Sequence, residues 1–151
     1  MVVSINLAVV EHAIRRERQY QDQKWGTLQE HPHALGAWLT LIRHRLRKAE
    51  DAWCGATNND EALRRILQVA SLITACLEQH LPAVKSFSSW MAESDVGSWL
   101  TILTHKLRIA EEGWMDGYEQ ATLSQLSVLR AACCACLMQN GVPERPAVRT
   151  T

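Results

Sequence analysis

The stretch LGAWLTLIRHRLRKAEDAWCG at residues 35–55 is echoed by VGSWLTILTHKLRIAEEGWMDG at residues 96–117. In both stretches the apolar residues recur at the spacing of one face of an α-helix. A shorter echo follows, from LITACLEQ at 72–79 to ACCACLMQ at 132–139. Each half of the chain therefore predicts a helix-loop-helix hairpin, and two related hairpins can bury each other's apolar faces around a pseudo-two-fold axis.

The rest of the chain adds one more helix and predicts a single all-α domain, a bundle of about five helices. We expect an N-terminal helix at 4–25, hairpins at 34–81 and 95–141, a connector at 82–94 and a loose tail at 142–151. The helices of the hairpins are expected at about 35–53, 60–80, 96–114 and 121–139. Ser4 is the expected N-cap of the first helix, and Asn59 or Asp60 that of the third, because these side chains satisfy free backbone N–H groups.

The composition is that of a globular protein without a strong overall electrostatic field. Of its 151 residues 47% are hydrophobic, and the 16 basic residues balance the 16 acidic ones. A neutral chain has no general attraction for nucleic acid or anionic membranes. No apolar run reaches the roughly 18 residues of a membrane span, and no leader pattern precedes the five cysteines, so we expect reduced, buried thiols in a cytoplasmic protein.

Three segments together resemble a known family: RERQYQDQKWG at 16–26, HPHALGAWL at 31–39 and ALRRILQVASLITACLEQH at 62–80. Over residues 16–80 the chain resembles the phage-encoded branch of the all-α nucleotide pyrophosphohydrolases, the MazG-like group. The resemblance implies a helical bundle, association into dimers or tetramers, and hydrolysis of nucleoside triphosphates. It also implies Mg²⁺, held by Glu-x-x-Glu on one helix and Glu-x-x-Asp on the next.

The chain departs from the family at these metal-binding positions. Aligned with the family, the paired acids fall on Arg45 and Lys48, and on Arg65 and Gln68. None of the equivalent positions of the second hairpin is acidic either: Lys106, Ile109, Gln125 and Val128. Arg and Lys side chains are suited to binding phosphate directly. The sequence therefore favours a non-catalytic phage accessory protein that binds a nucleotide or other phosphate-bearing ligand without a cofactor, or that inhibits a host protein.

Alternatives remain open for each of these residues. The cations could form a solvated face, with Arg65 paired to Glu61 and Arg64 to Asp60. A rearranged catalytic site could use Glu50, Asp51 and Glu61 with Mg²⁺, as an active pyrophosphohydrolase. A third class is a structural module for protein–protein contact, such as a homodimer.

Histidines and tryptophans supply the remaining candidates. His44 and its counterpart His105 could meet as metal ligands or as a pH-sensitive pair, or each could make one hydrogen bond at the boundary of the core. His31 and His33 are loop residues that could reach a ligand. Trp25 and Trp90 lie in loop-like sequence, where a tryptophan could stack on a base. The paired tryptophans of the hairpins are expected to be anchors in the core or at its boundary: Trp38, Trp53, Trp99 and Trp114.

Overall fold

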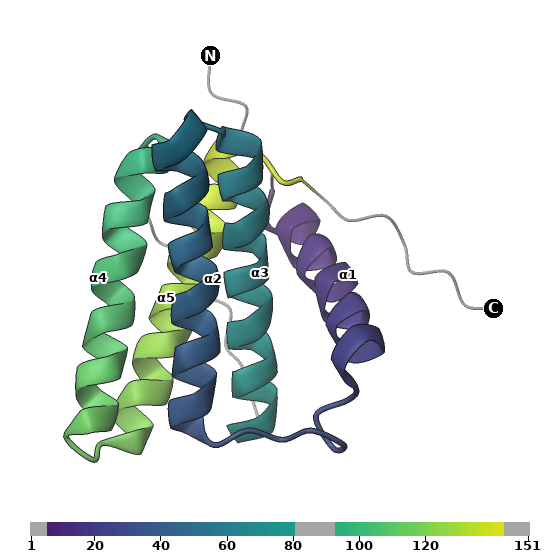
Figure 1. The fold of residues 1–151 in the computed structure, drawn as a ribbon, viewed down its shortest axis with the longest axis vertical. Helices are drawn as coiled ribbons and strands as arrows, with labels where there is room; N and C mark the ends of the chain where they lie inside the picture. The colour runs from purple at the N-terminus through teal and green to yellow at the C-terminus, as the bar shows by residue number, and fades with distance from the viewer. Residues whose placement is uncertain (1–5, 81–92, 144–151) are drawn as a thin grey trace.

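The computed structural model of the protein describes residues 6–80 and 93–143. These residues form five α-helices: α1 (Leu7–Trp25), α2 (Leu35–Ala56), α3 (Asn59–His80), α4 (Val96–Met115) and α5 (Glu119–Asn140). Figure 1 shows four of them packed side by side as a bundle, with α1 leaning against it beside α3. The expected all-α fold is confirmed, and the described residues contain no strand.

The helix ends differ from expectation by a few residues. The carboxamide of Asn6 caps α1 by accepting a hydrogen bond from the Val9 backbone N–H at 3.1 Å; the expected cap, Ser4, lies outside the described residues. Asn58, and not Asn59 or Asp60, caps α3, because its side-chain oxygen accepts from the N–H of Glu61 at 3.1 Å. Sequence alone allows any of these neighbouring polar residues, and the turn geometry decides among them.

The first hairpin turns within two residues. Helix α2 continues three residues past the expected end at Trp53 and stops where Thr57 adopts a left-handed conformation, with φ of 49°. The Thr57 N–H then bonds to the carbonyl of Trp53 at 2.8 Å. This satisfies one of the carbonyls that a helix end leaves free.

The second hairpin is built in the same way. Asp95 caps α4 by accepting from the Ser98 N–H at 3.0 Å. Gly117, with φ of 83°, lies in the turn, and α5 begins at Glu119, two residues before the expected start. The connector predicted at 82–94 and the tail predicted at 142–151 lie almost entirely outside the described residues, as does Trp90.

Helices α2 and α4 pack antiparallel, and the contacts between them occur in matched pairs. Arg43 of α2 forms an ion pair with Glu111 of α4 at 2.8 Å. At the positions that correspond in the sequence echo, Thr104 of α4 donates to Glu50 of α2 at 2.7 Å. Gly36 lies against the ring of Trp114, and Gly97 lies against the ring of Trp53. The two hairpins thus make equivalent contacts, although their origin as a repeat stays a prediction.

Each hairpin also ties its two helices together through a tryptophan and a glutamine. The indole N–H of Trp38 donates to the Gln79 side-chain oxygen at 3.0 Å, and that of Trp99 donates to Gln139 at 2.9 Å. Both tryptophans are buried, as expected for core anchors, so each N–H needs an internal partner. Trp53 and Trp114 are more exposed and cover the two glycines.

Helix α1 is fixed to the bundle by a charged clamp as well as by apolar packing. Val10, Ala13 and Ile14 join the core. The guanidinium of Arg130 on α5 donates to both carboxylate oxygens of Glu11 on α1, at 2.7 and 2.8 Å. The Nε of Arg130 also donates to the Thr74 hydroxyl of α3 at 2.7 Å. Burial is the largest single effect and lowers the pKa of Arg130, but the bonds to Glu11, together with the nearby Cys134, Cys133 and the Glu11 charge, raise it overall.

Helix α5 contains a long apolar stretch. By length and composition it could cross a membrane, but 67% of its apolar stretch is buried inside the bundle. Its thiols Cys133, Cys134 and Cys136 pack there with Cys76 of α3, all in the reduced form. The helix therefore has the character of a core helix.

Candidate functional site

A hollow lies where α1, the 26–34 loop, α2 and α3 meet. Its volume is about 350 Å³. Its wall is largely apolar, with Trp38 and Leu41 from α2 and Leu72 and Ala75 from α3. Polar groups enter from α1, from the loop and from Arg45 of α2. An apolar hollow with a few convergent polar groups is the usual form of a small-molecule site, and we call it the α1–α2–α3 cavity.

The loop that closes one side of the cavity is bound by Gln79, and the His80 ring also lies 3.3 Å from the His33 carbonyl. The Gln79 oxygen accepts from the backbone N–H of His33 at 3.1 Å, besides the indole of Trp38, and the Gln79 amide donates to the His33 carbonyl at 2.6 Å. The His33 ring meets the Trp38 ring edge-on, with centroids 4.9 Å apart. One carboxamide thus fixes both the loop and an aromatic wall of the cavity.

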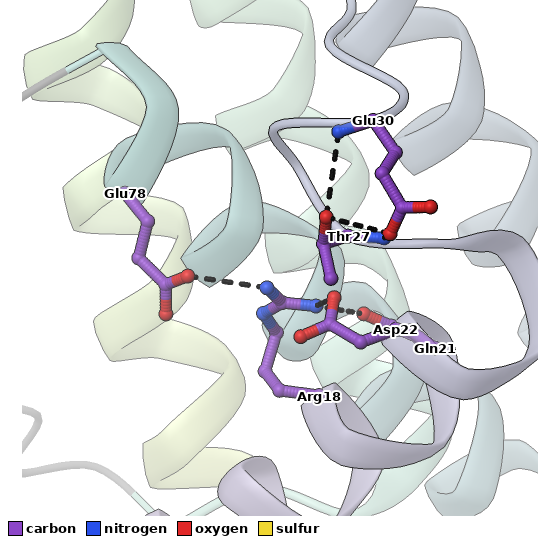
Figure 2. A network of polar contacts seen from close by, with 6 residues as sticks. All are labelled: Arg18, Gln21, Asp22, Thr27, Glu30 and Glu78. Atoms are coloured by element: carbon purple, nitrogen blue, oxygen red, sulfur yellow. Dashed lines mark hydrogen bonds and ion pairs between the residues drawn. The ribbon is translucent and has the colours of Figure 1, made fainter.

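Arg18 anchors the α1 side of the cavity (Figure 2). One terminal nitrogen donates to Asp22 at 3.0 Å and to Gln21 at 3.3 Å, and the other donates to Glu78 of α3 at 3.1 Å. The Arg18 side chain is only 11% exposed, and its Nε is buried with no partner among the described residues. An unpaired buried N–H lowers the stability of the fold by about 1–3 kcal/mol. The network therefore holds Arg18 in place against this unfavourable burial.

The turn after α1 is closed by a reciprocal pair drawn in the same view (Figure 2). The Glu30 carboxylate accepts from the backbone N–H of Thr27 at 3.1 Å and from its hydroxyl at 2.9 Å. These bonds lower the pKa of Glu30. Gly26, with φ of 87°, ends α1, and the ring of His31 fills the space that a side chain at Gly26 would need.

Arg45 is one of the predicted binding residues that line the cavity. It is half-buried, and its guanidinium carbon lies 5.6 Å from the centre of the Trp25 ring. Burial lowers its pKa, and so does the neighbouring charge of Arg65, while Glu17 and Tyr20 act in the opposite direction. An arginine does not lose its proton in this range, so Arg45 stays charged at the cavity wall, where an anion would stabilise it.

The other predicted binding residues are distributed differently. Trp25 lines the cavity and is 43% exposed. Arg65 lies near Arg45 but is engaged by Glu61 at 2.9 Å and by Gln68 at 3.1 Å. Lys48 and His44 are not among the residues that line the cavity, and His44 is exposed. The structure thus brings Arg45, Trp25 and Arg65 together, without Lys48 or His44.

The alternative catalytic carboxylates are dispersed. Glu50 faces α4 and accepts from Thr104, Asp51 is exposed, and Glu61 is paired with Arg65 and, at 3.5 Å, with Arg64. Across residues 6–80 and 93–143, no group of three or more His, Cys, Asp or Glu side chains could hold a metal ion. The Mg²⁺ that the family resemblance implies therefore has no matching ligand set in the described residues.

Two residues important to the cavity were not predicted as site residues. Arg18 lies in the polar run RRERQYQDQ, which gave no sign that one of its arginines is buried. Gln79 could have been found, because it is one of the residues shared by the two echoed segments. A polar residue retained at matched positions of two apolar helices indicates a buried hydrogen-bond partner.

Comparison of the chain with models of known protein families, with curated proteins and with solved structures found no match.

Proposed function

We propose that the protein binds a small anionic ligand, of the nucleotide or phosphate-bearing kind, in the α1–α2–α3 cavity without hydrolysing it. The observation that carries this proposal is the position of Arg45. Its guanidinium lies at the wall of an apolar hollow, near the Trp25 ring and the charge of Arg65, and no carboxylate of the described residues is hydrogen-bonded to it. An anion would relieve this unfavourable charge, and the Trp25 ring could stack on a flat ligand.

The sequence supports the wider part of the proposal. The segments that resemble the MazG-like group, at 16–26, 31–39 and 62–80, also supply most of the residues around the cavity. Arg45, Lys48 and Arg65 stand where that group has metal-binding acids. This replacement fits a cytoplasmic phage accessory protein that sequesters a ligand or that inhibits a host protein. An active pyrophosphohydrolase remains the alternative, and it would need a ligand set other than Glu50, Asp51 and Glu61.

A thermal-shift series with nucleotides, with Mg²⁺ and with EDTA, tests this proposal. We expect a rise in the melting temperature in EDTA that is lost in Arg45→Glu. Arg47→Glu is the matched control, because Arg47 is an exposed residue of the same helix that does not line the cavity. A rise that needs Mg²⁺ and is accompanied by release of pyrophosphate would refute the proposal in favour of the hydrolase.

A second candidate function, protein–protein contact, is favoured by the turn between α4 and α5. Trp114, Met115 and Tyr118 are 45%, 75% and 65% exposed there. Large exposed apolar side chains close together are typical of interaction sites. Light scattering after size-exclusion chromatography would test a homodimer, which the double variant Met115→Glu, Tyr118→Glu should dissociate.

A further inference from the structure

The charges around the cavity are nearly balanced. Arg18 is matched by Asp22 and Glu78, and Arg65 is matched by Glu61. These ion pairs leave little positive potential for a highly charged ligand. A polyphosphate would also approach the carboxylate of Asp22, which lines the cavity, and those of Glu78 and Glu61 beyond the lining, and like charges repel.

The uncompensated positive charge is confined to one side of the cavity. Arg45 is attracted by Glu17 but repelled by Arg65. The Lys24 ammonium lies outside the lining, 5.2 Å from the centre of the Trp25 ring. The cavity thus offers Arg45, with Lys24 at its rim, next to an aromatic surface.

The remaining wall sets the character of the ligand body. The apolar and aromatic side chains of the lining are those of Trp25, Leu28, Trp38, Leu41, Leu72 and Ala75. The volume of about 350 Å³ is near the lower end of the range for small-molecule sites, which begins at roughly 300 Å³. One or two fused rings with a short polar arm suit such a space.

We infer that the cavity takes a ligand with a flat, apolar body and a single negative charge, and that it discriminates against polyphosphates. This inference rests on the proposed function, because it names the class of anion that the same cavity binds. An aryl carboxylate and a cyclic phosphodiester nucleotide share this chemistry. In both, the anion would lie at Arg45 and the ring beside Trp25 and Trp38.

Matched probes test the charge and the ring separately. Isothermal titration of the full chain in EDTA would compare indole-3-acetate with neutral indole-3-acetamide, and cyclic AMP with AMP and ATP. We expect at least one monoanion to bind about tenfold more tightly than its neutral or more highly charged partner. Arg45→Met should remove that difference, Arg45→Lys should retain part of it, and Lys48→Met should leave it unchanged.

The outcomes separate this inference from the proposed function. Preference for indole-3-acetate identifies a carboxylate ligand, and preference for cyclic AMP identifies a phosphodiester. If ATP binds most tightly, in EDTA and in a manner that depends on Arg45, the inference is overturned and the proposed function stands. If indole-3-acetate and its amide bind equally and no nucleotide responds to Arg45→Met, both are overturned. The melting temperatures of the ligand-free variants would verify that each one folds.

Discussion

Replacing Glu11 with Gln should destabilise the protein far more than its position near the chain start suggests. The change removes the charge that two terminal nitrogens of Arg130 bind at 2.7 and 2.8 Å, and it leaves a guanidinium whose side chain is 6% exposed. Breaking a buried ion pair by removing one partner costs about 3–5 kcal/mol. Because Glu11 is 25% exposed and Thr74 still accepts from Arg130, we expect about 2–4 kcal/mol.

Urea unfolding followed by circular dichroism and tryptophan fluorescence measures this loss. Glu78→Gln is the matched control: it also removes a carboxylate that holds α1, but Glu78 is 46% exposed, so its pair with Arg18 should contribute no more than about 1 kcal/mol. Arg130→Met with Glu11→Gln should recover part of the loss, since the buried charge is then gone. A cost for Glu11→Gln below that of Glu78→Gln would refute the view that this clamp holds α1 in place.

Three further predictions concern the helices. Gly36→Ala and Gly97→Ala should each lower the free energy of unfolding by about 1–3 kcal/mol, because the new Cβ would lie 2.6 Å from the Trp114 ring or 2.5 Å from the Trp53 ring. Gly55→Ala should instead raise the free energy of unfolding by up to about 1 kcal/mol in the same urea assay, because the new Cβ would meet no atom within 4 Å. The exposed Cys54 should react with a thiol reagent in the folded protein. Cys76 and Cys136 should react only on unfolding, because burial raises their pKa values to about 12. Rapid modification of more than one thiol, detected by mass spectrometry, would contradict this. The pKa of Asp95 is lowered by its bonds to Ser98, so the stability that its charged form contributes is present above the ordinary Asp pKa and is lost as the pH falls through the lowered value. Asp95→Asn still caps the helix, so its melting temperature should fall less steeply at acid pH than that of the unmodified protein.

Helical periodicity was sufficient to predict α1 to α4, because apolar residues follow one face of each over several turns. Helix α5 has no such single face, since residues 129–137 are all buried, and its sequence echo with α3 supports the prediction instead. The caps were less accurate, since Asn58, Asn59 and Asp60 are all competent and only the turn between α2 and α3 selects Asn58. Thr57 is a similar case: nothing in its local sequence requires a left-handed residue, and the close packing of the hairpin imposes it.

The site was predicted only in part, for a physical reason. Periodicity places a residue on a face but does not say which neighbouring helix covers that face. Arg45 lines the cavity because the 26–34 loop and the end of α1 close over it, whereas Lys48, one turn further along, lies beyond the cavity lining. Arg18 is buried for the same reason, since Glu78 lies sixty residues away in the chain and approaches it only in the folded bundle.

The leaning helix α1 has one further consequence. The four-helix bundle presents two similar hairpins, but among the described helices α1 packs on α3 and α5 and has no counterpart beside α4. Among the described residues, the scaffold thus carries one pocket that is covered by α1, and this pocket lies on the first hairpin. Whatever molecule enters it should do so at a stoichiometry of one per chain, even in an assembly of several chains.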